Sequence, residues 1–177
     1  MKFAIAPLLL LTLSLSAMGQ EVIVRKEIAP ELPAAGKWIA SDKPLRLEDM
    51  RDKVVVVHFW KTQWDPCEQN FKVFDTIARE YNPKTFQIVG IHALDLENNP
   101  EFTDIEKIAL KHAKTFPTVV DDTDLNLKAW KVNTVPTTFV IDKKGKLRYA
   151  IEGQLVYRRF RGDLVLQKLV DDLMLEK

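Results

Sequence analysis

The residue with the clearest chemical potential in this sequence is Cys67. It is the single cysteine of the 177-residue chain, and it follows Trp64, Asp65 and Pro66. A thiol can attack a disulfide once it ionises to the thiolate. Because the chain has no second cysteine, it cannot form an internal disulfide, and any redox chemistry of Cys67 must be intermolecular.

Two opposing influences act on the ionisation of Cys67. The residue lies at the second position of a predicted helix, where backbone N–H groups and the helix dipole favour a thiolate. The carboxylate of Asp65 at the same helix end disfavours a second negative charge, and Cys67 shares a helix face with Phe71 and Phe74. Burial against such neighbours raises the pKa of a thiol. A buried, inert thiol is therefore the favoured interpretation, and a reactive thiol is the alternative.

The histidines are the other candidates for proton transfer or metal binding. His58 lies in an apolar run before Cys67 and could accept its proton, although a core histidine bonded to a backbone carbonyl is the favoured interpretation. We expect His92 and His112 to be structural or to lie at the surface. Three scattered histidines and one cysteine lack the spacing of metal ligands, so we expect no metal and no cofactor.

The elements that must position these residues follow an alternating pattern. The apolar run 54–60 predicts a central strand covered on both faces. A helix follows, with Asp65 as its N-cap, Pro66 at its first position and Glu68 completing a capping box. The other predicted strands are 86–92, 117–120, 137–141 and 147–151, with a hairpin turn at 142–146, and the other predicted helices are 101–113, 124–130 and 164–175. This order predicts an α/β fold whose mixed sheet has helices on both faces.

The N-terminal segment has the pattern of a secretory signal. Lys2 precedes an apolar stretch over 3–13, and small residues at Ala17 and Gly19 precede an expected cut at Gln20. The alternative is an uncleaved membrane anchor, which the short length and the interspersed hydroxyl residues disfavour. Residues 20–36 are predicted as a lead-in segment and 37–177 as the folded domain. Export would place the protein in an oxidising compartment, secreted or periplasmic, without membrane insertion after cleavage.

Composition excludes some classes of partner. The formal net charge is +1, and 46% of the residues are apolar, which suits one domain with a full core. Balanced charge gives no electrostatic reason to expect nucleic acid or an anionic membrane as a partner.

Three local signatures carry a family resemblance. They are residues 29–32 together with 45–57, residues 59–67 (FWKTQWDPC) and residues 135–142. With them the chain resembles the thioredoxin superfamily, and within it the TlpA/ResA-like, redoxin-type (AhpC/TSA) thiol–disulfide oxidoreductases. The resemblance implies a thioredoxin-like fold, in which helices flank a central mixed sheet that has an N-terminal hairpin extension. It also implies a cis peptide bond before Pro136.

The chain departs from this family at the redox motif. The family stretch FWATWCPPC places its attacking cysteine on Trp64 and its resolving cysteine on Cys67, and His58 stands where relatives carry Asp or Asn. Thiol–disulfide exchange needs an attacking thiolate and a second thiol to release the mixed disulfide. The resemblance therefore implies a degenerate site, with Cys67 as the single catalytic candidate.

The same resemblance indicates where a partner would bind. The implied partner-binding residues are Trp64, Asp65, Pro66, Val135 and Pro136. Trp64 could anchor a partner, or it could fold back and close the site. We expect an exported redoxin-type protein that binds a protein or peptide partner or keeps limited single-cysteine chemistry. The alternatives are a one-cysteine peroxidase and a non-catalytic binding or scaffold module.

Overall fold

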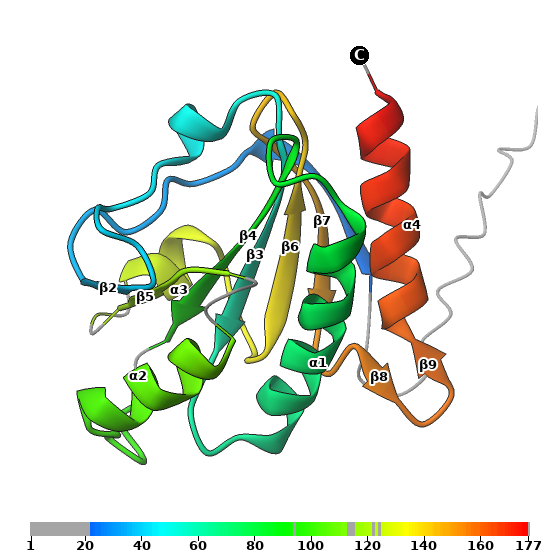
Figure 1. The fold of residues 1–177 in the computed structure, drawn as a ribbon. Coiled ribbons are helices and arrows are strands. Elements are labelled where there is room, and N and C mark those ends of the chain that lie inside the picture. The colour runs from blue at the N-terminus through cyan, green and yellow to red at the C-terminus, as the bar shows by residue number, and fades with distance from the viewer. Residues whose placement is uncertain (1–21, 94, 113–115, 122, 124, 177) are drawn as a thin grey trace, which may run out of the picture.

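A seven-stranded sheet organises the protein (Figure 1). The computed structural model describes residues 22–93, 95–112, 116–121, 123 and 125–176. The strands of the sheet are β1 (Val22–Ile28), β2 (Lys37–Ile39), β3 (Val54–Trp60), β4 (Phe86–His92), β5 (Thr118–Val120), β6 (Thr137–Ile141) and β7 (Lys146–Glu152). Their order across the sheet is β1-β7-β6-β3-β4-β5-β2. The sheet is mixed, because β3 pairs in parallel with β4 and antiparallel with β6.

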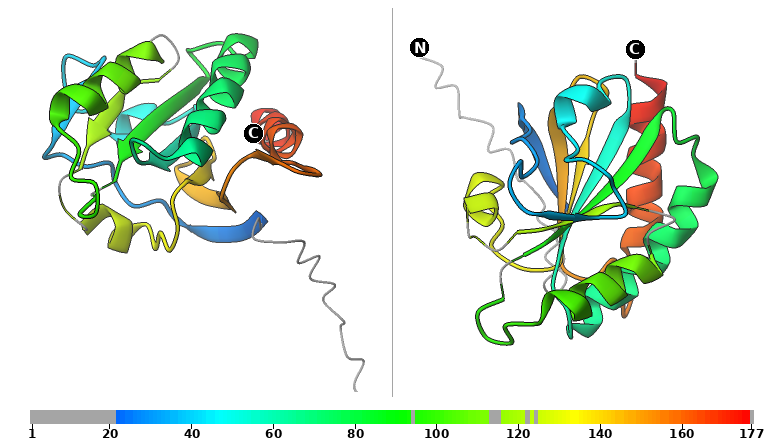
Figure 2. Two further views of the ribbon diagram at one scale, coloured as in Figure 1. Left: turned by 90° about the horizontal axis from the view of Figure 1, so that it is seen from below. Right: turned by 60° about the vertical axis from the view of Figure 1, so that its left-hand side comes forward.

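Helices cover both faces of the sheet (Figure 2). They are the 3₁₀ helix η1 (Leu47–Met50) and the α-helices α1 (Asp65–Glu80), α2 (Phe102–Lys111), α3 (Leu125–Ala129) and α4 (Gly162–Leu175). Apolar residues of α1, α2 and α4 form one buried cluster with alternate residues of β3, and η1 forms a second cluster with the intervening residues. A separate hairpin, β8 (Val156–Tyr157) and β9 (Phe160–Arg161), precedes α4. The expected thioredoxin-like arrangement of a mixed sheet between helices is confirmed.

The apolar run 54–60 forms the central strand β3, as predicted. All seven of its residues are buried, and their side chains alternate between the two clusters. Its register places His58 between Gly90 of β4 and Thr138 of β6. Because β3 lies between β6 and β4, its carboxyl end, which leads to Cys67, is in the middle of the sheet.

The start of α1 differs from the prediction by one residue. Trp64 is the N-cap, so Asp65 and Pro66 are the first two helical residues and Cys67 is the third. The carbonyl of Trp64 accepts a hydrogen bond from the N–H of Cys67 at 2.8 Å, which begins the helical bonding before Asp65. No side-chain capping bond forms at this end, so the predicted capping box is wrong.

The N-terminal segment also differs from the expectation. Strand β1 pairs antiparallel with β7 and β2 pairs antiparallel with β5, so the two strands lie at opposite edges of the sheet instead of forming a hairpin with each other. Each covers an edge whose backbone N–H and C=O groups would otherwise be unpaired. The predicted lead-in thus supplies one strand of the sheet. The predicted signal segment, 1–19, lies outside the described residues.

The remaining elements lie close to their predicted positions. The strands 86–92 and 137–141 are confirmed at both ends, and α4 begins two residues before the predicted start. The predicted ends of two helices at Ala113 and Asp124 fall outside the described residues. Within the part of the chain that the structure describes, no helix is long and apolar enough to cross a membrane.

Candidate functional site

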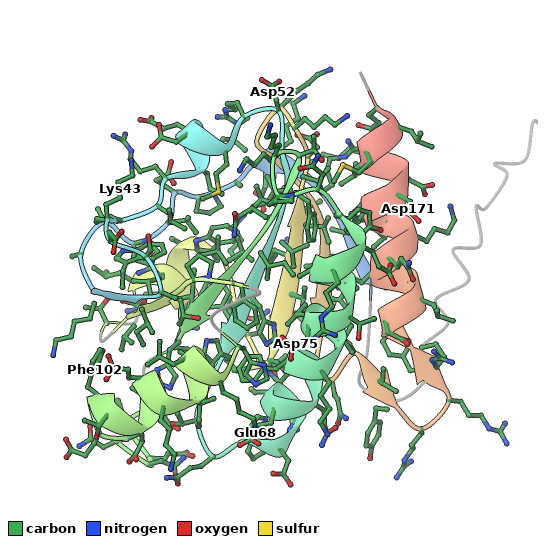
Figure 3. The ribbon with its side chains drawn as sticks, viewed as in Figure 1. Lys43, Asp52, Glu68, Asp75, Phe102 and Asp171 are labelled. Atoms are coloured by element: carbon green, nitrogen blue, oxygen red, sulfur yellow. The ribbon has the colours of Figure 1, made fainter. Side chains whose placement is uncertain are left out.

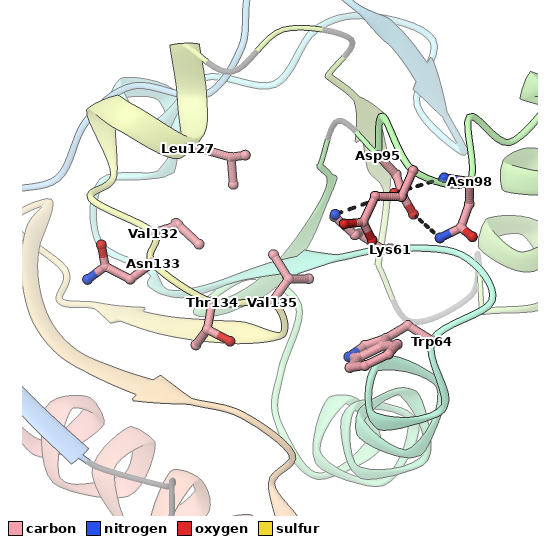
Figure 4. Close-up of a pocket in the computed structure, with 10 residues that line it drawn as sticks. Lys61, Trp64, Asp95, Asn98, Leu127, Val132, Asn133, Thr134 and Val135 are labelled. Atoms are coloured by element: carbon pink, nitrogen blue, oxygen red, sulfur yellow. Dashed lines mark hydrogen bonds and ion pairs between the residues drawn. The ribbon is translucent and has the colours of Figure 1, made fainter.

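A cavity of about 400 Å³ lies where α1 begins beside the loop that precedes β6 (Figure 4). Trp64 and Val135 face it from these two elements, and Lys61 and Asp95 line it from the ends of β3 and β4. Parallel neighbouring strands bring their carboxyl ends to the same edge of a sheet, which is why residues so distant in sequence meet here. The fold thus gathers the signatures 59–67 and 135–142 around one opening.

Cys67 is fully buried beneath this opening and does not line it. It belongs to the cluster that contains Phe71 and Phe74, as the shared helix face predicted. The backbone N–H of Lys61 donates a hydrogen bond to its Sγ at 3.4 Å. Burial nevertheless dominates and raises the pKa of the Cys67 thiol to about 12. This agrees with the interpretation of a buried thiol that stays protonated at neutral pH.

His58 is a core histidine in this structure. Its Nδ1 lies 3.1 Å from the hydroxyl of Thr138, and its ring makes edge contacts with Phe74 and Phe71, the centroids being 4.6 and 6.0 Å apart. Complete burial lowers the pKa of His58 to about 3. Its Nε2 has no hydrogen-bond partner among the described residues, and no hydrogen bond joins the ring to Cys67 there. A proton transfer between the two side chains is therefore without structural support.

Trp64 stands at the rim of the cavity. Trp64 is 51% exposed while it lines the cavity. The peptide bond between Val135 and Pro136 is cis, as the resemblance implied. Of the other predicted partner-binding residues, Asp65 is exposed, Pro66 is half-buried and Pro136 is buried. Each of the two signatures therefore contributes one apolar side chain to the cavity lining, Trp64 from 59–67 and Val135 from 135–142.

A buried carboxylate at the same site was not predicted from the sequence. Asp95 accepts hydrogen bonds from the N–H of Asn98 at 3.3 Å and from its side-chain amide at 2.9 Å, and Nζ of Lys61 lies 3.5 Å away. Burial opposes ionisation of Asp95, but these bonds and the Lys61 charge lower its pKa below the usual value. Only the positions of Asp95 and Lys61 in the sequence could have indicated this pair, because the two residues follow adjacent parallel strands.

The other two histidines have structural roles and neither is a surface residue. Nε2 of His92 accepts a hydrogen bond from the N–H of Thr62 at 3.2 Å, and burial lowers the pKa of His92 to about 4. Nδ1 of His112 lies 3.0 Å from a carboxylate oxygen of Asp75. Across the described residues, no group of three or more His, Cys, Asp or Glu side chains is arranged to hold a metal ion.

Comparison with known proteins identifies the family of this chain. The family model described as AhpC/TSA matches residues 27–150. The thiol-disulfide oxidoreductase ResA of Geobacillus thermodenitrificans is 31% identical over 153 residues, which cover 82% of this chain and 85% of that protein.

Solved structures show the same fold. A thioredoxin-like superfamily protein, SPOA0173, matches with a TM-score of 0.73 and 22% identity over 86% of this chain and 98% of its own. A putative thiol:disulfide interchange protein DsbE from Chlorobium tepidum matches with a TM-score of 0.68 and 25% identity over 84% of this chain and 97% of its own. The chain therefore belongs to the AhpC/TSA family and is a redoxin-type protein of thioredoxin-like fold, related to thiol–disulfide oxidoreductases.

Proposed function

We propose that this protein is an exported member of its family that binds an extended segment of a protein or peptide partner without catalysing thiol–disulfide exchange. The observation that carries the proposal is the pairing of a half-exposed Trp64 at the cavity rim with a fully buried Cys67. The first offers a contact surface, and the second offers no accessible thiolate. Export rests on the sequence pattern of residues 1–19.

The absence of turnover follows from the chemistry of exchange. An attacking thiolate and a resolving thiol are both required, and the chain has one cysteine. That cysteine has a pKa raised to about 12 by burial, so its thiolate is scarce at neutral pH. Cys67 would remain a thiol inside the first turn of α1 while the cavity above it binds a partner.

The cavity has features that suit a polypeptide. Trp64 and Val135 supply apolar contact, and a large aromatic side chain at the edge of a pocket is a common anchor of interfaces. The loop residues Asn133 and Thr134, which also line it, are exposed and polar. An extended segment could therefore contact the ring of Trp64 while its backbone lies along this loop.

The alternative of a one-cysteine peroxidase has less support. Such an enzyme needs a thiolate that peroxide can reach, and Cys67 is both buried and held protonated. Stoichiometric consumption of hydrogen peroxide by the native protein, lost in Cys67→Ser, would favour the peroxidase and overturn our proposal.

Fluorescence anisotropy with labelled, S-carboxymethylated α-lactalbumin tests the proposal, because this probe is a permanently unfolded polypeptide without free thiols. We expect saturable binding that is unchanged in Cys67→Ser and at least about tenfold weaker in Trp64→Ala. Tyr157→Ala is the matched control, since Tyr157 is an exposed aromatic residue on the β8–β9 hairpin and does not line the cavity. Absence of binding, equal loss in both aromatic variants, or catalytic insulin reduction above the dithiothreitol background would contradict it.

A further inference from the structure

A second cavity, of about 580 Å³, lies beside the carboxyl ends of β4 and β5, against β2 and the start of α2. Its volume is within the range of small-molecule sites in proteins. The wall combines apolar residues, including Phe102 and Ile105, with the charged residues Lys37, Asp95 and Asp121. Figure 3 shows Phe102 at the start of α2, on the side where β2 and β5 lie. Neither Trp64 nor Val135 contributes to this cavity.

Asp121 is the unusual group in this wall. It is 4% exposed and follows β5, where its N–H donates to the carbonyl of His92 at 3.0 Å. Its Oδ1 accepts hydrogen bonds from the N–H and the hydroxyl of Thr123, at 3.2 and 2.8 Å. Its Oδ2 is buried and has no hydrogen-bond partner among the described residues. A buried carboxylate oxygen without a donor is unfavourable, so an additional donor at the Asp121 carboxylate would be stabilising.

The balance of charge in the wall indicates the sign of such a ligand. Asp95 already has Lys61 at 3.5 Å and the amide groups of Asn98 as partners. His92 is neutral at physiological pH, because burial lowers its pKa to about 4. Within the described residues, no ion pair joins the Asp121 carboxylate to a basic side chain. A cation would therefore gain more here than an anion or a neutral molecule.

Lys37 shows what kind of cation fits the wall. Its exposed ammonium group lies 4.5 Å from the centroid of the Phe102 ring, so the ring face at the cavity already holds a cation. The aliphatic stem that carries this ammonium belongs to β2, at the cavity wall. An external ligand could displace the Lys37 side chain from the ring, rest its own apolar stem there and place its charge at Asp121.

We propose that this cavity binds an organic cation, an ammonium or guanidinium group on an apolar stem, with its charge at Asp121 and its stem against Phe102 and Ile105. The group could belong to a free amine or to a lysine or arginine side chain of a bound polypeptide. The site does not depend on the function proposed for the Trp64 cavity, because the two cavities share only Asp95.

Titration with phenethylamine, followed by NMR on the folded mature protein, tests the charge requirement. We expect saturable shifts at the amides of Phe102, Ile105 and Val120, and binding at least about tenfold weaker for the neutral analogue 2-phenylethanol. Asp121→Asn should weaken phenethylamine binding by at least about tenfold. Asp104→Asn is the matched control, because Asp104 lies on α2 but does not line this cavity.

Lys37→Met gives a second, independent variant in case Asp121→Asn perturbs folding. Removal of the resident ammonium should tighten phenethylamine binding several-fold, since the ligand no longer competes with it for the Phe102 ring. Absence of saturable shifts, equal affinity for 2-phenylethanol, shifts confined to Trp64 and Val135, or no tightening in Lys37→Met would each overturn the proposal.

The source of the cation is distinguished by a pair of peptides. Acetyl-Gly-Lys-Gly-amide and its norleucine counterpart differ only in the ammonium group. Tighter binding of the lysine peptide than of n-butylamine supports a polypeptide ligand, and weaker binding supports a free amine. A norleucine peptide that binds as tightly as the lysine peptide would contradict the cation site itself.

Discussion

The backbone N–H of Lys61 donates a hydrogen bond to Sγ of Cys67, with 3.4 Å between the two atoms. This bond joins the residue that follows β3 to the first turn of α1, so the thiol is enclosed by the connection between strand and helix. The donor favours a thiolate, but burial has the larger effect and raises the pKa to about 12. Cys67 therefore acts at neutral pH as a packed thiol.

Alkylation of Cys67 by iodoacetamide should be slow in the native protein. At pH 8 a thiol with a pKa near 12 has about a thousandfold less thiolate than an unperturbed one, and burial also limits access. We expect the native rate to be lower by at least that factor than the rate in guanidinium chloride, measured by mass spectrometry. Rapid native labelling at pH 6 would show that the thiolate is stabilised after all.

Acidification should destabilise the protein through two buried histidines. The folded-state pKa values of His58 and His92, about 3 and about 4, lie below the ordinary value of 6.5. Between pH 6.5 and 4 the unfolded chain therefore binds protons that the folded chain does not. The free energy of unfolding should therefore decrease as the pH is lowered through this window, by up to about 1.4 kcal/mol per pH unit for each histidine.

Urea unfolding at pH 7, 6 and 5 measures this dependence. His58→Asn should reduce the slope of stability against pH by the contribution of one histidine, whatever it does to stability at pH 7. His92→Asn should act in the same way, and the double variant should lose both contributions. An unchanged slope in all three variants would contradict the assignment to these residues.

Substitution of Trp64 by cysteine should restore a redox-active pair. Position 64 is the N-cap of α1 and precedes Cys67 by one helical turn, and a thiol there would lie at the exposed helix end where the dipole favours a thiolate. Titration of Trp64→Cys against glutathione should show reversible loss of both free thiols, with Trp64→Ser as the control. A reducing potential is expected, because Asp65 disfavours the thiolate. A folded variant that forms no 64–67 disulfide would show that the site no longer has dithiol geometry.

The side chain of Asn70 should be important for stability. It is fully buried on α1, its Oδ1 accepts a hydrogen bond from the N–H of Leu155 at 2.7 Å, and its amide lies 3.4 Å from the carbonyl of Gly153. Asn70→Ala leaves these backbone groups without a partner and should cost about 2 kcal/mol of unfolding free energy. Gln69→Ala, at the exposed neighbouring position, should change stability by less than about 0.5 kcal/mol. Equal urea midpoints for the two variants would refute this role.

Several features followed from the sequence because they depend on local pattern. The apolar run 54–60 predicted β3, and the helical spacing of Phe71 and Phe74 from Cys67 predicted that the thiol faces the core. The cis bond before Pro136 was implied by the family resemblance of 135–142 alone. In each case the information lies within a few residues of the chain.

Other features required the folded chain. The separation of β1 and β2 to opposite edges of the sheet depends on partners in β7 and β5, which local pattern does not specify. Trp64 is the N-cap in place of the predicted Asp65, because its extended backbone places its carbonyl to accept a hydrogen bond from the N–H of Cys67. The side-chain pattern of Asp65 and Glu68 does not report this backbone bond.

Some features of the candidate site likewise follow from the sequence, and others only from the fold. The sequence by itself determined that one cysteine stands in a redoxin-type motif, with a tryptophan at the attacking position and therefore no dithiol pair. Only the tertiary structure decided that Thr138, eighty residues further along, holds the ring of His58, that Lys61 and Asn98 stabilise the Asp95 carboxylate, and that Asp121 keeps a buried oxygen without a donor. The physical reason is that burial and partners set the charge and pKa of a side chain, and both come from strands that meet only when the sheet forms.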